Sequence, residues 1–220
     1  MNEIPSFKII VSKYNEDIKW TDYFYKSDII IYDKSLKPIP GSIPLPNVGM
    51  NQHTYFHYIV NNYYNLPDYV IFLQGNPFDH MKRDITSENF QQKIYELILS
   101  KPETIKDVYI PNWHIHTLNE LSPGLKVPEY YEYFFGVKFP GVIKFTSGSQ
   151  YIIPKSRILE RPLEFYEEIY KMATDIGPND FLWFDVHHND EPFDPSFITA
   201  WSLERFFLPI FGGIANDFTV

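Results

Sequence analysis

Residues 46–80, PNVGMNQHTYFHYIVNNYYNLPDYVIFLQGNPFDH, decide the fold of this chain. They run in order through a glycine turn, an amphipathic helix, a short apolar strand and a polar strand end. Gly49 in the turn can adopt a positive φ or let a ligand approach the backbone closely. A unit of this kind builds open α/β sheets, in which ligands bind beyond the carboxyl ends of the strands. The alternative is an ordinary loop at the end of an α/β unit.

The periodicity of the stretch distinguishes its helix from its strand. One helical face is predicted by the spacing of Phe56, Ile59, Val60, Tyr63 and Tyr64. Residues 69–73 form an apolar run that is too short for a helix, so they predict a strand covered on both faces. Polar residues follow that strand at once, namely Gln74, Gly75, Asn76 and Asp79. This strand end is therefore the first candidate site.

The rest of the chain continues the alternation of strands and helices. Further strands are predicted at 7–11, 28–32, 108–110, 142–145 and 150–153, and a short helix carries Trp20 and Phe24. Longer helices are predicted from Ser87 to Pro102, from Pro154 through Met172, and over 197–211. Residues 111–139 lack a clean period, which predicts a long loop or small insertion over the carboxyl edge of the sheet. The expected fold is α/β: one Rossmann-like domain over residues 1–220, with a mostly parallel central sheet flanked by helices.

Composition excludes several classes of protein. The 19 basic and 28 acidic residues give a net charge of −9, which disfavours nucleic acid as a partner. No apolar run is long enough to span a bilayer. The chain contains no cysteine, and its first residues lack the basic and apolar regions of a secretion signal. These features predict a cytoplasmic protein.

The histidines leave a metal site open as an alternative. His53 and His57 lie four residues apart on one helix face, but Thr54 stands where the HExxH motif of metalloproteases has its glutamate. His187 and His188 lie among Asp185, Asp190 and Glu191. That group predicts either a divalent cation site, as in a metal-dependent hydrolase, or a solvated loop. The glycine and serine motifs of serine hydrolases, P-loop enzymes and dehydrogenases are missing.

Carboxylates are then the main candidates for acid–base chemistry. Asp79 follows a strand end, and Asp185 follows the apolar run at 181–184. Glu204 lies three residues from Trp201 on a predicted helix, so that an aromatic wall can stand beside it. A carboxylate in such a place can act as a general base. The adjacent Arg205 favours a helix-surface ion pair instead.

Several motifs together resemble those of a widespread family of uncharacterised α/β domains. They are Tyr14-Asn15-Glu16-Asp17-Ile18-Lys19-Trp20, Tyr32-Asp33-Lys34, Leu45-Pro46-Asn47-Val48-Gly49, His53-Thr54-Tyr55, Asn65-Leu66-Pro67 and Phe72-Leu73-Gln74-Gly75. Two later motifs, Ser147-Gly148-Ser149-Gln150 and Leu203-Glu204-Arg205-Phe206, extend the resemblance over nearly the whole chain.

That family in turn is similar to nucleotide-sugar-dependent glycosyltransferases of the GT-A type, which implies a GT-A-like fold. The resemblance implies that the chain moves a sugar from a nucleotide-sugar donor to a hydroxyl of a glycan-type acceptor. Donor-binding residues would be Ser12, Tyr14, Lys34, Asn47, Gly49, Thr54, Gln74, Gly75 and Asn76. Gly148, Ser149 and Gln150 would bind the acceptor, and Glu204 or Asp185 would be the general base. Lys13, Lys34 or Arg157 would neutralise the departing diphosphate.

The metal position departs from the GT-A pattern. These enzymes have Asp-x-Asp at the end of the central strand, where this chain has Gln74-Gly75-Asn76. Amides hold Mn²⁺ or Mg²⁺ weakly, so metal binding would depend on Asp79 or His80. The same departure leaves a catalytically silent carbohydrate-binding domain on this scaffold as an alternative.

Overall fold

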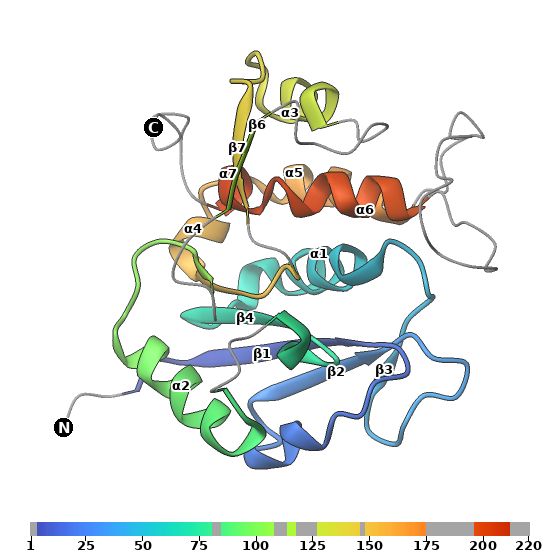
Figure 1. Cartoon of the computed structure of the whole chain (residues 1–220), viewed down its shortest axis with the longest axis vertical. Helices are drawn as coiled ribbons and strands as arrows, with labels where there is room; N and C mark the ends of the chain where they lie inside the picture. The colour runs from blue at the N-terminus through green and yellow to red at the C-terminus, as the bar shows by residue number, and fades with distance from the viewer. Residues whose placement is uncertain are drawn as a thin grey trace.

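The structure is a computed structural model that describes residues 4–80, 85–107, 114–117, 127–145, 148–174 and 196–211. Its centre is a six-stranded sheet in the order β3-β2-β1-β4-β8-β5 (Figure 1). The strands are β1 (Phe7–Lys13), β2 (Ile29–Asp33), β3 (Ile43–Pro44), β4 (Tyr69–Gln74), β5 (Lys106–Asp107) and β8 (Tyr151–Pro154). The first four run parallel, and β8 is antiparallel to both β4 and β5. The prediction of a mostly parallel α/β sheet is therefore confirmed.

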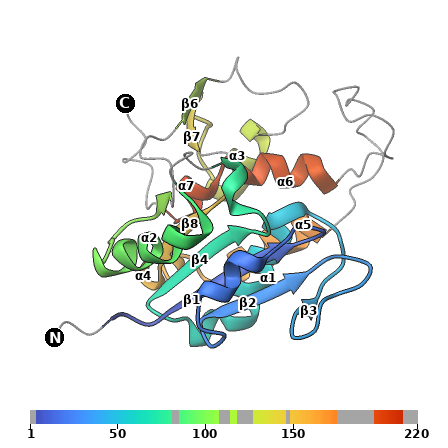
Figure 2. The same cartoon turned by 60° about the horizontal axis from the view of Figure 1, so that its bottom comes forward.

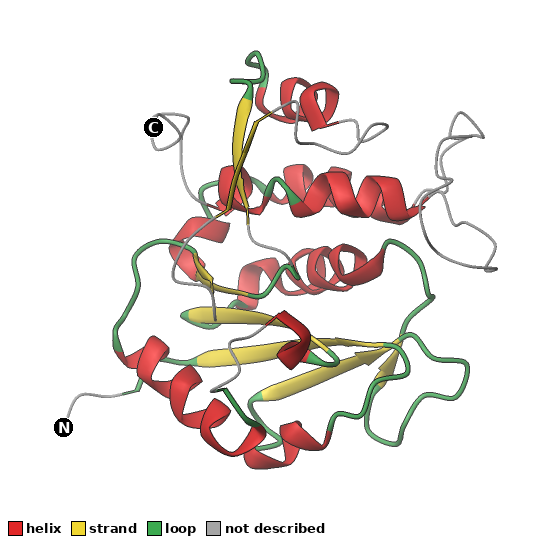
Figure 3. Cartoon of the chain, viewed as in Figure 1, coloured by secondary structure: helices red, strands yellow, loops and turns green. Residues whose placement is uncertain are grey.

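Helices cover both faces of the sheet (Figure 3). One face carries the 3-10 helix η1 (Lys19–Tyr23) and α2 (Ser87–Leu99). The other carries α1 (Met50–Asn62), on which α5 (Leu163–Thr174) and α6 (Ser196–Glu204) pack. The shorter helices are η2 (Tyr63–Asn65), η3 (Pro77–His80), α4 (Lys155–Ile158) and α7 (Phe207–Phe211).

The alternation of side chains along each strand divides the core into two clusters. Ile10 and Phe72 face α1, and Tyr55 stacks on Phe72 with ring centroids 4.4 Å apart. Ile9 and Ile71 face α2 and the aromatic group around Trp20. Apolar residues on both sides of one strand are the mark of a parallel sheet buried between helices. The continuous apolar runs of β1 and β4 arise from this burial.

Residues 114–145 differ from the prediction. A long loop or insertion was expected over 111–139, but β6 (His114–Thr117) pairs with β7 (Val142–Phe145) in a separate two-stranded sheet, and α3 (Val127–Phe135) lies between them in sequence. Consequently β7 and β8 are not a hairpin, because each pairs within a different sheet. The aromatic side chains of α3 hid its period, since they pack mainly on one another and on Phe165 and Phe206.

Two predicted long helices are each divided. The helix expected after Pro154 ends at Ile158 and resumes at Leu163, because Pro162 cannot continue the first segment. The last helix is interrupted between Glu204 and Phe207. The strand predicted at 108–110 lies outside the described residues. None of the helices in the described ranges has the length and apolar character needed to cross a bilayer.

Candidate functional site

The strand order places a topological switch point between β1 and β4. The chain passes from β1 to β2 on one side and later returns to β4 on the other side of β1. Figure 2 shows β1, β2 and β4 side by side with their carboxyl ends at the same edge. In open α/β sheets the ligand crevice lies beyond such a point. Ser12 and Lys13 at the end of β1 and Gln74 at the end of β4 lie at this edge. The polar strand end predicted at Gln74 is therefore at the switch point.

A network of polar side chains connects the elements that meet there. The Ser12 and Thr54 hydroxyls lie 2.9 Å apart and join β1 to α1. Gln74 Nε2 donates to the Gly148 carbonyl at 2.8 Å, and Gln150 Nε2 donates to the Pro77 carbonyl at 2.9 Å. Because β8 runs antiparallel to β4, its first residues arrive at the edge where β4 ends. The predicted donor and acceptor residues of these segments are therefore brought together.

The turn before β8 holds a backbone conformation that side chains rarely adopt. Gly148 has φ 91° and Ser149 has φ 51°, and Ser149 is fully buried. Gln52 Nε2 donates to the Ser149 hydroxyl at 2.9 Å and so ties this turn to the first turn of α1. A non-glycine residue in the left-handed region is held there by its surroundings, and such residues cluster at functional sites. Gln52 was not singled out in the sequence, since nothing in its position along α1 identifies a partner at residue 149.

Glu204 anchors the same turn. Its Oε1 accepts a hydrogen bond from the Gly148 amide at 2.8 Å, and its Oε2 pairs with the Arg205 guanidinium. The two side chains are only 15% and 18% exposed, so this ion pair is largely buried rather than on the helix surface. Glu204 therefore lies at the predicted acceptor segment with both carboxylate oxygens engaged. Asp185, the other candidate base, lies outside the described residues, as does the group around His187.

Lys13 and Asp33 form a buried ion pair across β1 and β2. Lys13 Nζ lies 3.2 Å from Asp33 Oδ2, and the two side chains are 7% and 0% exposed. Burial raises the pKa of Asp33, but hydrogen bonds from Ser35, Ile39 and Lys13 outweigh it and hold that pKa below its usual range. Lys13 also donates to the Tyr14 carbonyl at 2.8 Å. Asp33 was quoted in the sequence only as part of a motif, and its isolated position gave no sign of this partner.

The backbone at the start of α1 packs against α5, in the place where a ligand was expected to approach it. Gly49 caps the helix with φ 57°, and a Cβ at that position would lie 2.0 Å from the Ala173 carbonyl oxygen of α5. The close approach anticipated from this glycine is thus made by α5. Lys34 Nζ donates to the Val48 carbonyl at 2.7 Å and also to that of Met50. Burial lowers the pKa of Lys34 to about 7. Asn47 is exposed on the preceding loop.

Two groups rim the edge beside Gly75. Glu16 accepts a hydrogen bond from the Tyr14 amide at 2.6 Å and lies over Gly75, where a Cβ would be 2.6 Å from its Oε2. Tyr14 is 42% exposed. The Gly75 carbonyl accepts from Trp20 Nε1 at 2.8 Å. Glu16 is therefore a half-buried side chain and Tyr14 an exposed one at the switch point. A side chain at Gly75 would displace the Glu16 carboxylate that lies over it.

Two carboxylates of the described residues lie just beyond β4, that of Asp79 in η3 and that of Glu16 beside Gly75. Asn76 donates through Nδ2 to Asp79 Oδ1 at 2.6 Å, and its amide oxygen accepts from the Phe78 amide. No group of three or more metal-binding side chains occurs in the described part of the chain. A divalent cation bound here would depend on Asp79 or Glu16 and on oxygens of the substrate, which is how Mg²⁺ is commonly held. His80 ends η3, and its side chain is not described.

A histidine is buried beside this site on α1. His53 is fully buried, and neither ring nitrogen has a hydrogen-bond partner among the described residues. Its ring stacks on Tyr170 with centroids 5.2 Å apart, and His57 Nδ1 lies 3.1 Å from the Tyr170 hydroxyl. Burial first, then the charges of Lys34 and His57, lower the pKa of His53 to about 3. Both histidines are thus neutral rings packed against Tyr170 between α1 and α5.

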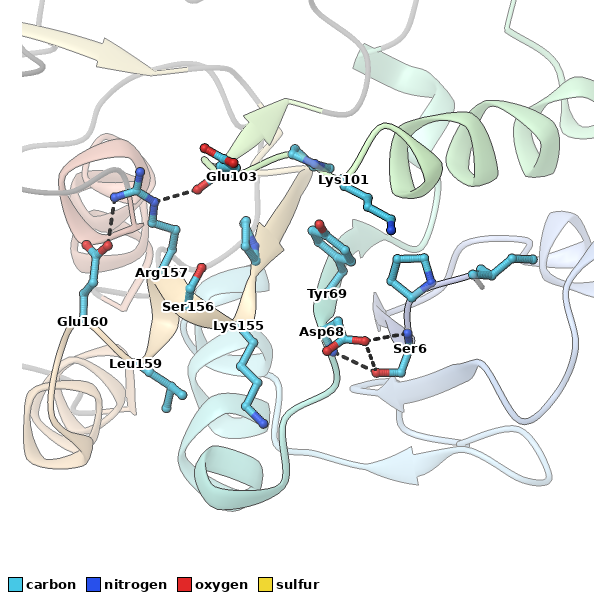
Figure 4. Close-up of a pocket in the computed structure, with 14 residues that line it drawn as sticks. Ser6, Asp68, Tyr69, Lys101, Glu103, Lys155, Ser156, Arg157, Leu159 and Glu160 are labelled. Carbon is cyan, nitrogen blue, oxygen red and sulfur yellow. Dashed lines mark hydrogen bonds and ion pairs between the residues drawn. The ribbon is translucent and has the colours of Figure 1, made fainter. Parts of the chain in front are cut away.

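A separate cavity of about 1140 Å³ lies at the opposite end of the strands (Figure 4). Asp68 in this cavity accepts two hydrogen bonds from Ser6, each 2.8 Å long. Arg157 donates to the Glu103 carbonyl and pairs with Glu160 at 2.8 Å. The antiparallel direction of β8 carries Arg157 to this end, so its predicted role near a diphosphate at the switch point is wrong. The cavity contains balanced charges, and Asp68 and Arg157 already have protein partners.

The fold and this edge together define an open α/β protein with a polar switch point. The chain belongs to the family described as "Protein of unknown function (DUF3431)", which it matches over residues 9–214. Membership of an uncharacterised α/β family is thus confirmed, and the similarity to glycosyltransferases remains a proposal. Comparison with curated proteins found no match. Comparison with solved structures likewise found none.

Proposed function

We propose that this protein binds a nucleotide sugar at the carboxyl edge of β1 and β4 and transfers the sugar to a hydroxyl group. The observation that carries the proposal is the polar network across this edge, which joins Gln74 at the end of β4 to Gly148 and Gln150 at the start of β8. The switch point, the left-handed turn at Gly148 and Ser149, and the motif resemblance support the same location.

The exposed rim and the buried network would have different tasks. Tyr14, Glu16 and Asn76 are accessible enough to contact a nucleotide or its sugar, whereas Ser12 and Thr54 shape the floor. Lys13 and Lys34 contribute positive charge below the surface, but both already bind protein oxygens. Their effect on a diphosphate would therefore be electrostatic rather than by direct contact. A divalent cation bound with Asp79 would supply further charge neutralisation at the leaving diphosphate.

Glu204 is the candidate base within the described residues. A carboxylate oxygen can accept two hydrogen bonds, so Glu204 could take a proton from an acceptor hydroxyl while Oε1 accepts from the Gly148 amide and Oε2 pairs with Arg205. Glu204→Gln removes the basic oxygen while its amide oxygen can still accept from Gly148. We expect this variant to bind donor normally and to lose about 100-fold or more in turnover, the usual contribution of general base catalysis.

A thermal-shift screen of nucleoside diphosphates and nucleotide sugars, with and without Mn²⁺, tests donor binding. A donor at 100 times its dissociation constant should raise the midpoint by about 5 °C or more. Release of nucleoside diphosphate in the presence of saccharide acceptors then tests transfer. If no donor shifts the midpoint under either condition, the proposal is wrong.

A second candidate is a carbohydrate-binding domain without turnover. The neutral Gln74 and Asn76 and the engaged oxygens of Glu204 favour it. In this case a nucleotide sugar or glycan would stabilise the protein while no diphosphate is released, and Glu204→Gln would leave binding unchanged. Turnover above the background rate would exclude this candidate.

A further inference from the structure

The outer edge of β2 is paired over only part of its length. β1 pairs with β2 along Ile29–Asp33, but β3 covers only Tyr32 and Asp33. No described strand pairs with Ile29, Ile30 and Ile31 on the outer side. Three successive isoleucines therefore form an open edge, a feature that proteins generally protect with charge or proline.

The direction of the open backbone groups follows from the ladder to β1. Ile9 donates to the Asp28 carbonyl at 2.7 Å, and Lys34 donates to the Lys13 carbonyl at 2.8 Å. In a parallel ladder alternate residues bond to opposite neighbours, so Ile30 and Tyr32 bond to β1. The amide and carbonyl of Ile29 and of Ile31 point outward, but the parallel pairing of Tyr32 with Ile43 already uses the Ile31 carbonyl, which accepts from the Ile43 amide. The amide and carbonyl of Ile29 and the amide of Ile31 are therefore the groups left open by β3. The Leu45 amide takes the next outward carbonyl, that of Asp33, at 3.0 Å.

A cavity of about 580 Å³ runs along this edge. Ile29 and Ile31 face the α2 side of the sheet and Ile30 faces the α1 side, yet all three line the cavity. Residues that point to opposite faces can share a cavity only if it lies beside the strand. Its far wall is formed by the segment 39–41 and by Ile43.

A tight turn explains why this space is not filled by β3. Ser42 donates to the Ile39 carbonyl at 3.2 Å across Pro40 and Gly41, and Gly41 has φ 85°. Proline followed by a glycine of positive φ is the pattern of a type II turn. This turn directs the chain away from β2, and β3 begins only after it. The position of a neighbouring strand is therefore open beside residues 29–31.

The charges around the cavity are already neutralised. Asp17 pairs with Lys19 at 3.1 Å, and Asp22 pairs with Lys26 at 3.2 Å. Apart from Thr21 and Gly41, the remaining wall is formed by isoleucines and Pro40. The cavity consequently suits an uncharged segment with apolar side chains at alternate positions.

We propose that this edge binds an extended, uncharged apolar peptide segment of another protein, which adds a strand beside Ile29–Ile31. Its backbone would bond to the amide and carbonyl of Ile29 and to the amide of Ile31, and its alternate side chains would enter the cavity, as in other cases of strand addition. A second copy of this chain fits less well. Paired antiparallel about Ile30, it would bring its Asp28 beside Tyr32, where Ile43 already lies, whereas a short peptide can end beside Ile31. The inference is independent of the proposed transferase activity.

The probe is a fluorescein-labelled six-residue peptide of alternating valine and threonine, acetylated and amidated, measured by fluorescence anisotropy. We expect saturable binding to the wild-type protein. Ile31→Pro should weaken it at least tenfold, because proline removes the outward donor but no bond to β1. The matched variant Ile31→Val, which keeps the amide, should bind within about twofold of the wild type.

Two further measurements keep the test decisive. Ile39→Glu, which places a charge in the far wall, should also weaken binding tenfold, so the result does not depend on how well the proline variant folds. Methylating the peptide amides at one alternate set of residues should abolish binding, and methylating the other set should not. Absence of binding at about 1 mM protein, or equal binding by both methylated peptides, would overturn the proposal. So would a dimer in light scattering that Ile31→Pro dissociates, since the occupant would then be a second copy.

Discussion

Gly49 shows how backbone conformation and packing can both require a glycine at one position. Its φ of 57° and the Ala173 carbonyl oxygen, 2.0 Å from where a Cβ would stand, are two separate demands for glycine. The first is a backbone preference, and the second is a contact between α1 and α5. A positive φ or a close approach of a ligand was predicted at Gly49, and the positive φ is confirmed. The contact with Ala173 could not be predicted, because that residue lies 124 positions away in the sequence.

Gly49→Ala should therefore be costly. A left-handed conformation costs an alanine about 1 kcal/mol, and the contact with a backbone atom cannot be relieved by a side-chain rotation. We expect a loss of about 3 kcal/mol or more in the free energy of unfolding, measured in urea. Gly136→Ala is the matched control, since Gly136 has φ 64° with no atom within 4 Å of the added Cβ. Equal losses for the two variants would show that the contact with α5 is unimportant.

The buried His53 should make stability depend on pH. Its pKa is lowered to about 3 in the folded protein, against about 6.5 when unfolded. The unfolded chain then binds more protons between these values, so stability falls as the pH drops below 6.5. The slope should reach about 1.4 kcal/mol per pH unit.

Urea unfolding between pH 7.5 and 5 measures this slope, and carboxylates contribute little in that range because they stay ionised. His53→Phe keeps an aromatic ring against Tyr170 and should flatten the dependence. His57, whose pKa is lowered mainly by burial, and Lys34, whose pKa of about 7 lies at the upper end of this range, would leave a smaller residual slope. An unchanged slope in His53→Phe would place the titrating group elsewhere.

At the scale of elements, the carboxyl ends of β1 and β2 are joined by the Lys13–Asp33 pair. Asp33 also accepts the amides of Ser35 at 2.9 Å and Ile39 at 3.1 Å, so one carboxylate fixes the course of the chain after β2. The pair thereby links the sheet to the segment that leads into the turn at Pro40 and Gly41.

Asp33→Ala should leave the Lys13 ammonium buried without its carboxylate. Breaking a buried pair in this way typically costs about 3–5 kcal/mol, and we expect a loss of this size in urea unfolding. Asp17→Ala removes the exposed pair with Lys19, in which the side chains are 66% and 86% exposed, and should cost less than about 1 kcal/mol. Comparable losses in the two variants would contradict the view that burial sets the difference.

Helices and strands were predictable where burial of apolar side chains alone set the sequence pattern. The strands β1 and β4 and the helix α1 follow from continuous or periodic apolar runs. The helix α3 was missed because its aromatic residues occupy several faces, and the breaks at Pro162 and after Glu204 interrupt patterns that continue in sequence. The positions of Gln74 and Gly148 were foreseeable as strand ends, but their mutual hydrogen bond depends on the direction of β8, which no local pattern encodes.

At the scale of the whole molecule, two separate hydrophobic clusters pack on opposite faces of the sheet. Phe207 of α7 stacks on Tyr151 with centroids 4.9 Å apart and contacts Phe56 on one face. Phe90 of α2 packs on Trp20 and Phe24 on the other. The C-terminal helix is therefore part of the core rather than an appendage.

Phe207→Ala and Phe90→Ala should each cost about 3–5 kcal/mol, because each removes a fully buried aromatic ring. The two rings belong to different core clusters of the described residues. The two losses in the free energy of unfolding should therefore add to within about 0.5 kcal/mol in the double variant. Urea unfolding followed by both far- and near-ultraviolet circular dichroism would test this. Marked non-additivity would mean that the two faces are coupled through the sheet.

The late position of β8 in the chain affects how the protein is synthesised. β4 ends at Gln74, but its neighbour on that side begins only at Tyr151, 77 residues later. At ribosomal speeds of about 5–20 residues per second, the nascent chain exposes one side of its central strand for about 4–15 seconds. During this interval the unpaired edge of the apolar strand β4 can pair with strands of other chains. We therefore expect newly made chains to rely on chaperones, more so when translation is slow.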